Sequence, residues 1–185
     1  MISIPEGNFL RLNKGQKYHN AFGFLGIGAG VEYYFSDKQS ISASIGTVTD
    51  FMLPFPAPVD YMGSYQRSFA FYVDIQTGTD FKRLHCDAGL QYNRTSFYER
   101  ETVELFPNYL DTLKYSKQQD NLGCALSAYY RISRSFNLGI NYYPSFIVFN
   151  NGAITTHYGH LMFFELIFRI NAGGHKKSQN NSFLL

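Results

Sequence analysis

The chain lacks tryptophan, has only two cysteines and is poor in charged residues over its 185 positions. Charged residues make up 16%, whereas aromatic residues reach 18%. This balance argues against intrinsic disorder, which needs high charge and few aromatic residues. The net charge of +2 is spread along the chain. Nucleic-acid-binding proteins usually carry a clustered basic stripe, so we expect no nucleic-acid partner.

Long hydrophobic runs are also missing, because no stretch approaches the roughly 20 apolar residues of a membrane-spanning helix. A membrane barrel strand needs only about 9–11 residues with an alternating pattern, so crossing by strands stays open. Residues 1–6 show neither the basic nor the apolar region of a signal peptide. For an exported protein we therefore expect a mature or truncated N-terminus or a misassigned start; otherwise the export hypothesis fails.

Two cysteines, Cys86 and Cys124, are too few for a disulfide framework in a chain of this size. Both fall among the apolar positions of their segments, where a free cysteine behaves as a small hydrophobe. No histidine or acidic residue stands at ligand spacing from them, so we expect no metal and no cofactor. The glycines at 26, 28 and 30 alternate within one segment rather than preceding a helix, which does not fit a phosphate-binding loop.

What the sequence does contain is a strict alternation of apolar and small polar residues. In 135–149 the even positions are mostly apolar, and the odd ones begin Ser135, Asn137, Gly139 and Asn141. Side chains alternate across a strand with period two, so each such segment has one apolar and one small polar face. Seven segments are predicted as strands on this basis: 21–35, 40–51, 68–79, 83–95, 121–133, 135–149 and 156–171.

Short and long connections alternate between these segments. The turns at 36–38, 79–82 and 133–134 are tight and polar, whereas the links at 52–67, 98–119 and 150–155 are longer. This rhythm is typical of transmembrane barrels, which also need an even number of strands. An eighth strand fits only in 2–12, with 13–19 as its loop. We expect a barrel domain over 1–171, with its first strand uncertain within 1–19, and a disordered polar tail over 172–185.

The polar face is mostly small and uncharged, which suits a cramped interior better than a solvated surface. The predicted fold is therefore all-β: an antiparallel up-and-down transmembrane barrel of about eight strands, apolar face outward and lumen filled by side chains. Asp50 and Arg83 also share the parity of this face, and the charges on it either pair across strands or, for several of them, lie hydrated at the rims. For six charged residues on that face we expect pairing across strands, because unpaired buried charges are costly: Glu32, Asp74, Asp87, Arg131, Glu165 and Arg169.

Aromatic residues gather toward the segment ends, at 33–35, 97–98, 129–130 and 142–143. They indicate either interfacial girdles of a membrane barrel or the ordinary strand preference of tyrosine and phenylalanine. The run Gly30-Val31-Glu32-Tyr33-Tyr34-Phe35 before a tight turn, and Tyr142-Tyr143-Pro144, complete the pattern.

Over residues 20–171 the chain resembles the small porin-like outer-membrane barrels of Gram-negative bacteria, similar in architecture to OmpA and OmpX. The resemblance implies a monomer in the cell outer membrane, surrounded by outer-membrane lipids. One feature departs from the family pattern: members often end on an aromatic residue in the last strand, whereas this chain continues past Phe168-Arg169-Ile170.

Specific function is expected in the long links, because strands serve as the scaffold. The link at 53–58 is stiffened by three prolines, and 102–117 is apolar enough to carry a helical turn. These segments either bind an extracellular protein or glycan or form a lid over the barrel mouth. The sequence thus predicts a structural or surface-interaction role. The candidate binding residues are Phe55, Tyr61, Tyr65, Phe106 and Tyr109.

Two alternatives remain open: a barrel enzyme that modifies lipids, and a soluble calycin-like barrel with its apolar face around a ligand. For the enzyme, Ser145, His157, His160 and Glu165 are the residues to test. His157 and His160 have opposite parity and point to opposite faces, so they cannot form one cluster. No motif of a lipid A deacylase or palmitoyltransferase is found, and we assign no catalytic residue. His85 is expected in the lumen and His19 in a loop.

Overall fold

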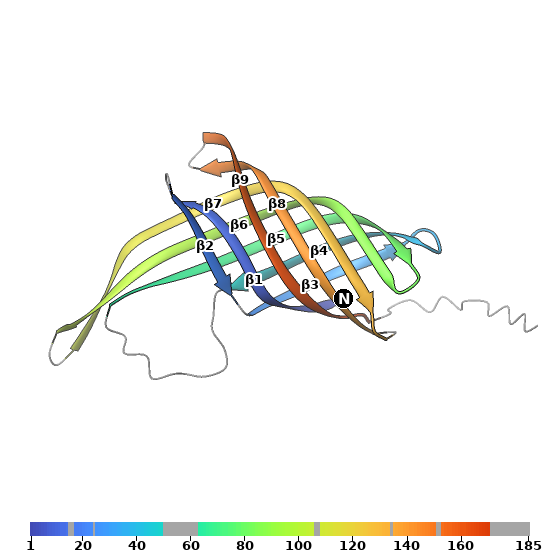
Figure 1. The fold of residues 1–185 in the computed structure, drawn as a ribbon, viewed down its shortest axis with the longest axis horizontal. Helices are drawn as coiled ribbons and strands as arrows, with labels where there is room; N and C mark the ends of the chain where they lie inside the picture. Colours follow the sequence, from blue (N-terminus) through green and yellow to red (C-terminus); the bar gives the residue numbers. More distant parts are fainter. Residues whose placement is uncertain are drawn as a thin grey trace, which may run out of the picture.

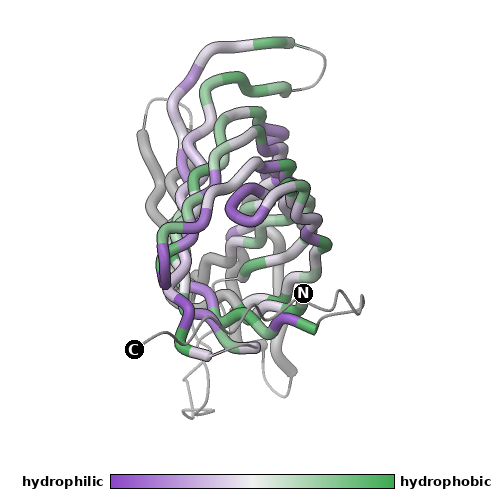
Figure 2. The backbone as a smooth tube through the Cα atoms, turned by 90° about the vertical axis from the view of Figure 1, so that its right-hand side faces the viewer, coloured by the Kyte–Doolittle hydropathy of each residue, from purple (hydrophilic) through white to green (hydrophobic). Residues whose placement is uncertain are grey.

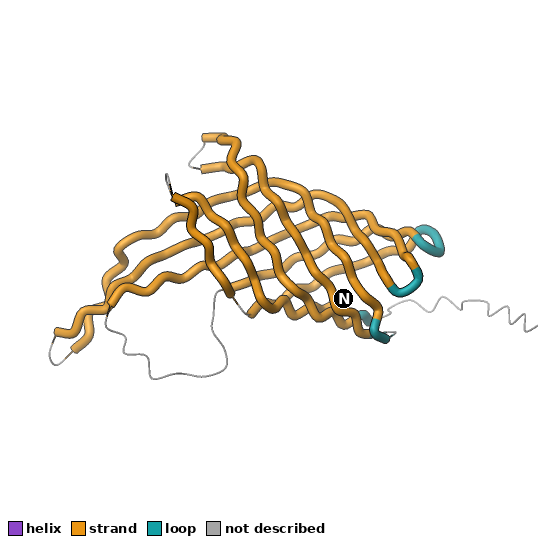
Figure 3. The backbone as a smooth tube through the Cα atoms, in the orientation of Figure 1, coloured by secondary structure: helices purple, strands orange, loops and turns teal. Residues whose placement is uncertain are grey.

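The strands follow one another around a single sheet in a computed structural model (Figures 1 and 3). It describes the backbone of residues 1–14, 17–23, 25–49, 63–105, 108–133, 135–150 and 153–170, and most of their side chains. None of the described residues belongs to a helix long and apolar enough to cross a membrane. The strands are β1 (Ile2–Lys14), β2 (Lys17–Gly23), β3 (Leu25–Tyr34), β4 (Gln39–Thr49), β5 (Gly63–Phe81), β6 (Leu84–Leu105), β7 (Asn108–Arg131), β8 (Phe136–Asn150) and β9 (Ala153–Phe168).

These nine segments make a ring of eight strands. β2 and β3 pair with β1 in one continuous register, because Asn8 faces Gly23 and Ser3 faces Gly28. They therefore serve as one strand of the sheet. β1 also pairs with β9, which closes the ring, and every neighbouring pair is antiparallel. The predicted antiparallel barrel of eight strands is confirmed.

The first strand is real and longer than its weak alternation indicated. β1 runs through Pro5 to Lys14, and its register with β9 shifts between Glu6 and Phe9. The predicted loop at 13–19 is wrong, because β2 begins at Lys17 and contains His19. Pairing on both sides explains the difference: a strand that closes a ring satisfies its backbone groups regardless of local propensity.

The short turns lie together at one end of the ring. The Asp80 N–H donates to the Lys38 carbonyl at 2.8 Å, and the Arg131 N–H donates to the Arg83 carbonyl at 2.7 Å. We call residues 35–38, 82–83 and 132–135 the short-turn rim. Its described turns are the teal segments of Figure 3.

At the other end β5, β6 and β7 continue past the remaining strands (Figure 1). The predicted links at 52–67 and 98–119 are therefore too long. β5 begins at Gly63, and the helical turn expected in 102–117 is replaced by strand in every described residue of that range. Alternation fades there because a sheet without an apolar environment on one face needs no period-two pattern. We call residues 63–67, 98–105 and 108–117 the protruding sheet.

The two faces of the ring separate as the alternation predicted. Along β7 the odd residues from Asn121 to Tyr129 are buried inside, whereas Leu122 and Leu126 are exposed outside. Figure 2 looks at the ring from the short-turn end and shows hydrophilic and hydrophobic residues alternating along the strands. The end of β8 contradicts the prediction: its register shifts near Phe146, and this bulge turns Val148 inward and Ile147 and Phe149 outward.

Candidate functional site

The outer surface carries an apolar belt of defined height. On β6 the outward positions from Leu84 to Tyr92 are apolar or aromatic, and on β7 those from Leu122 to Tyr130 are too. Each stretch spans nine residues, within the roughly 9–11 that a strand needs to cross the hydrocarbon core. We call residues 84–92 and 122–130, with their outward neighbours on the other strands, the apolar belt.

Immediately beyond the belt, on the side of the protruding sheet, an ion pair faces outward. Arg94 Nε lies 2.6 Å from Asp120 Oδ1, and the Tyr92 hydroxyl donates to the same carboxylate at 2.8 Å. The Arg94 hydrogen bond holds the pKa of the Asp120 carboxyl below its usual value. A charged pair at this height marks the boundary where the apolar surface ends.

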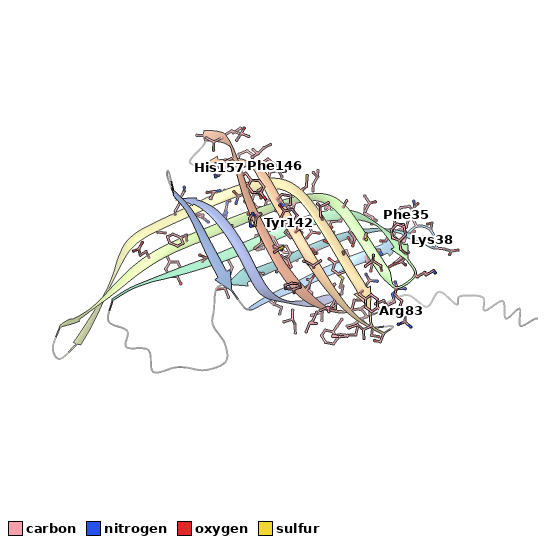
Figure 4. All side chains as sticks on the ribbon, in the orientation of Figure 1. Phe35, Lys38, Arg83, Tyr142, Phe146 and His157 are labelled. Carbon is pink, nitrogen blue, oxygen red and sulfur yellow. The ribbon has the colours of Figure 1, made fainter. Side chains whose placement is uncertain are left out.

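Aromatic side chains stand at both edges of the belt. Near the short-turn rim these are Tyr33, Phe35, Phe81 and Tyr130, and toward the protruding sheet they include Tyr92, Tyr142, Phe146 and Tyr158. Figure 4 labels Phe35 at one end and Tyr142 and Phe146 toward the other. The Tyr142 and Tyr158 hydroxyls are 2.6 Å apart. This distribution is that of two interfacial girdles.

Inside the ring, just above the short-turn rim, three carboxylates converge on one histidine. His85 is 3% exposed; its Nδ1 lies 2.8 Å from Asp80, and its Nε2 lies 2.8 Å from Asp87 and 3.5 Å from Glu32. The carboxylates come from β3, β5 and β6. The cluster thus joins strands that are far apart in the sequence.

Two arginines complete this cluster. Arg169 Nε lies 3.2 Å from Glu32, and Arg131 lies 3.2 Å from Asp80. Because Arg169 follows β9 and Glu32 lies on β3, their contact ties the last strand of the ring to one near its start. Three carboxylates against two arginines leave a deficit of one positive charge, which a protonated His85 would supply.

Of the six charged residues predicted in the lumen, four therefore join the His85 cluster, and Asp80 was missed. Asp80 lies in a segment that the sequence assigned to a turn, whereas β5 runs on to Phe81. The sequence did contain a signal for Asp80, which lies five residues before His85 at the end of the preceding segment. Asp87 lies two residues after His85 on the same polar face, so both carboxylates are close to the histidine along the chain.

Asp74 and Glu165 lie higher in the lumen, where neutral groups surround them. Asp74 accepts hydrogen bonds from the Tyr143 hydroxyl at 2.8 Å, from Gln76 Nε2 at 3.0 Å and from Ser44. Glu165 accepts from Asn141 Nδ2 at 2.6 Å. No cation among the described residues forms an ion pair with either carboxylate, so hydrogen bonds compensate for the loss of solvation of these buried groups.

The small residues of the inner face provide room for large ones. A side chain at Gly139 would collide with the Tyr129 ring, and one at Gly46 with Tyr72. Tyr72, Tyr143 and Phe163 pack with ring centroids 5.3–5.5 Å apart. These glycines thus leave space for inward-pointing aromatic rings, which fill this part of the lumen.

Toward the protruding sheet the lumen is filled by amides and hydroxyls. Asn121 Nδ2 donates to Asn93 Oδ1 at 2.7 Å, and Gln119 Nε2 donates to Asn121 Oδ1 at 2.6 Å. Ser145 accepts from Gln91 Nε2 at 2.8 Å and from Asn93 Nδ2 at 3.2 Å. These bonds link β6, β7 and β8 across the interior, so amide and hydroxyl side chains fill this part of the lumen.

Among the residues tested for catalysis, Ser145, His160 and Glu165 do not form a nucleophile–base set. Ser145 engages amides, which take no proton from a hydroxyl group, whereas Glu165 engages Asn141. His160 contacts the outward-facing Tyr142 and Tyr158, on the face opposite Ser145. His85 lies in the lumen as expected.

The other sequence-based candidates divide between described and undescribed positions. Cys86 and Cys124 are free and lie on the outward face, and Arg83 lies exposed in a turn of the rim. No group of histidine, cysteine or acidic residues that could hold a metal ion occurs in the described part of the chain. Among the loop candidates, Tyr65 and Tyr109 lie on strands of the protruding sheet. The other three loop candidates, Phe55, Tyr61 and Phe106, lie outside the described part of the chain. Asp50 and the tail at 172–185 lie outside it too.

Comparison with solved structures identifies the architecture. The crystal structure of Ail, the attachment invasion locus protein of Yersinia pestis, matches with a TM-score of 0.52 and 11% sequence identity, covering 91% of this chain and 96% of that one. A second Ail structure, in complex with the heparin analogue sucrose octasulfate, matches with a TM-score of 0.50 and 12% identity, covering 90% and 95%. The chain has the fold of the small outer-membrane β-barrels.

The crystal structure of Neisserial surface protein A (NspA) is matched with a TM-score of 0.48 and 8% identity, covering 91% of this chain and 96% of that one. No protein-family model matches the sequence, and no curated protein matches it significantly. The resemblance to small porin-like barrels of the OmpA and OmpX type is confirmed at the level of fold.

The outer-membrane barrel fold also decides between the two orientations of the strands. Leu90 is 67% exposed and Val31 is 72% exposed, whereas the inner face carries the charges and amides. A soluble barrel would bury these apolar residues around a ligand, so the calycin-like alternative is wrong.

Proposed function

We propose that this protein is an integral outer-membrane barrel with a structural or surface-interaction role, in which the protruding sheet contacts a partner outside the cell. The observation that supports the proposal is that a nine-residue apolar belt on the outside surrounds a lumen filled by side chains. The belt supports insertion among outer-membrane lipids. The packed lumen argues against an open pore and directs the search for function to the protruding sheet.

The ring closure supports a monomer. Every strand of the belt pairs on both sides, so the barrel itself leaves no edge that a second chain would have to cover. The protruding sheet differs in this respect. β7 pairs with β8 only from Asp120 onward, so among the described residues its stretch from Asn108 to Gln119 pairs on one side, with β6.

An open strand edge presents backbone N–H and C=O groups to which an extended segment of another protein can add. The open edge therefore favours an extended protein segment as the partner. Charge does not separate this partner from a sulfated glycan of the kind represented by sucrose octasulfate in the Ail complex. The protruding sheet carries four cations, Arg67, Arg100, Lys114 and Lys117, against four carboxylates, Glu99, Glu101, Glu104 and Asp111.

Location is tested by membrane fractionation with a heat-shift gel. The proposal expects the protein in the detergent-soluble outer-membrane fraction, with a change in electrophoretic mobility on boiling. A protein that stays soluble without detergent, with the same mobility before and after boiling, refutes membrane insertion.

The role of the protruding sheet is tested by removing it. Glu99 and Tyr115 are register partners, so residues 100–114 can be replaced by an Asn-Gly turn without disturbing the barrel. Bacteria displaying each form are tested for adhesion to immobilised matrix proteins and to immobilised heparin. We expect the deletion to keep the heat shift and lose adhesion to protein. An Asp37→Asn variant, in a turn at the opposite end, serves as the control. Adhesion that survives the deletion contradicts the proposal.

A further inference from the structure

Three exposed cations gather on the short-turn rim. Lys38 lies in the turn between β3 and β4, and Lys82 and Arg83 form the turn between β5 and β6. The two turns adjoin, because the Asp80 N–H donates to the Lys38 carbonyl. No carboxylate of the described residues forms an ion pair with any of the three. Asp37 is the only acidic residue in these two turns.

These cations stand directly beyond the aromatic edge of the apolar belt. Arg83 Nη1 donates to the Tyr130 hydroxyl at 3.4 Å, and Phe81, next to Lys82, is 60% exposed. Phe35, three residues before Lys38, is 56% exposed. Figure 4 shows Phe35, Lys38 and Arg83 at this end. Aromatic rings of such a girdle lie at headgroup level, so the cations lie where lipid phosphates are.

Lys82 also occupies an unfavourable backbone conformation. It is the one described non-glycine residue with a positive φ, 59°. A two-residue hairpin turn accommodates glycine or asparagine there at lower cost, since a side chain in the left-handed region is disfavoured by about 1–2 kcal/mol. Backbone positions of this kind cluster at functional sites, which makes Lys82 a candidate for a role beyond closing the turn.

We infer that Lys38, Lys82 and Arg83 form a binding surface for the phosphate headgroups of anionic phospholipids around the short-turn rim. The inference rests on the proposed membrane insertion. Charge complementarity favours this occupant, because the two turns carry three cations and one acidic residue, whereas cations and carboxylates are equal in number over the protruding sheet. The surface thus fixes which end of the barrel lies in the leaflet that supplies these lipids.

The test is lipid binding to the full chain in non-ionic detergent, followed by native mass spectrometry. The probes are phosphatidylglycerol and phosphatidylcholine of equal chain length. A cation near an anionic membrane surface strengthens binding by about fivefold. We therefore expect tighter binding of phosphatidylglycerol, weakened by about fivefold in Lys38→Gln and on the order of 100-fold in the Lys38→Gln/Lys82→Gln/Arg83→Gln triple variant. The preference should also fall as salt is raised.

Two variants separate lipid binding from folding. Lys82→Gly removes the charge, and glycine adopts the positive φ without steric cost. This variant should therefore bind phosphatidylglycerol more weakly, while its unfolding midpoint stays at an equal or higher urea concentration. The Lys14→Gln/Lys17→Gln/Lys114→Gln control removes three lysines from the opposite end and should leave the preference intact. A triple rim variant that keeps the preference overturns the inference even when its heat shift is normal. So does rim-dependent binding to purified cell-wall sacculi without a lipid preference, which would assign the surface to a polymer.

Discussion

The depth of the apolar belt predicts that one substitution has very different costs at two outward positions of β7. Leu126 lies midway between the belt ends at Leu122 and Tyr130 and is 44% exposed. Gln118 lies on the same face of the same strand, beyond the Arg94–Asp120 pair. Arginine at Leu126 would enter the hydrocarbon core, whereas arginine at Gln118 would lie near the headgroups or in water.

The magnitudes follow from the cost of burying arginine in lipid. An arginine on the lipid face of a barrel costs about 2–4 kcal/mol at the midplane and about 0–1 kcal/mol near the interface. Leu126→Arg should therefore lower the folded-to-unfolded ratio by roughly 30- to 1000-fold, and Gln118→Arg by less than about tenfold. Against a total stability of about 5–15 kcal/mol, the first change is severe without preventing folding.

The assay is urea unfolding of the protein in lipid vesicles, followed by the heat-shifted band on a gel. The linear dependence of the unfolding free energy on urea gives the stability of each variant, and equal slopes ensure that the same surface is exposed on unfolding. The two variants are compared at the same lipid composition, because bilayer thickness sets the depth of each position.

Equal costs at the two positions would refute the orientation. If Leu126→Arg lost less than about 1 kcal/mol relative to Gln118→Arg, Leu126 would not face lipid. The same result would then remove the basis for placing the belt at residues 84–92 and 122–130.

Two further predictions concern the lumen. Glu32→Gln should lower the free energy of unfolding by about 3–5 kcal/mol, because it leaves the Arg169 guanidinium without its carboxylate inside the barrel. Glu32→Gln/Arg169→Met should recover part of that loss. A double variant less stable than the single one would contradict the ion pair between Glu32 and Arg169. Gly139→Ala should cost about 1–3 kcal/mol by displacing the Tyr129 ring. In urea titrations, adding Gly139→Ala to Tyr129→Ala should cost much less than adding it to the native chain, whereas additive costs would show that the residues do not touch.

The alternation of apolar and polar side chains was sufficient to predict most of the fold. It placed seven strands, the outward direction of Leu138 and Ile140, and the inward direction of His85 and Asp87. Period two leaves no other arrangement once the small polar face is enclosed. The start of β2 within the expected loop at 13–19, the bulge near Phe146 and the full length of β6 and β7 escaped this reasoning. In each case pairing with a neighbouring strand overrides the local pattern.

The candidate site divides in the same way. Residue type and parity by themselves determined which charged groups enter the lumen, because a buried charge needs a partner wherever that partner comes from. Only the tertiary structure decided the partners: Asp80 rather than Asp87 meets Arg131, and Asp80, Asp87 and Glu32 share His85. These contacts depend on the register of strands around a closed ring, and register is set by the whole set of pairings rather than by any one segment.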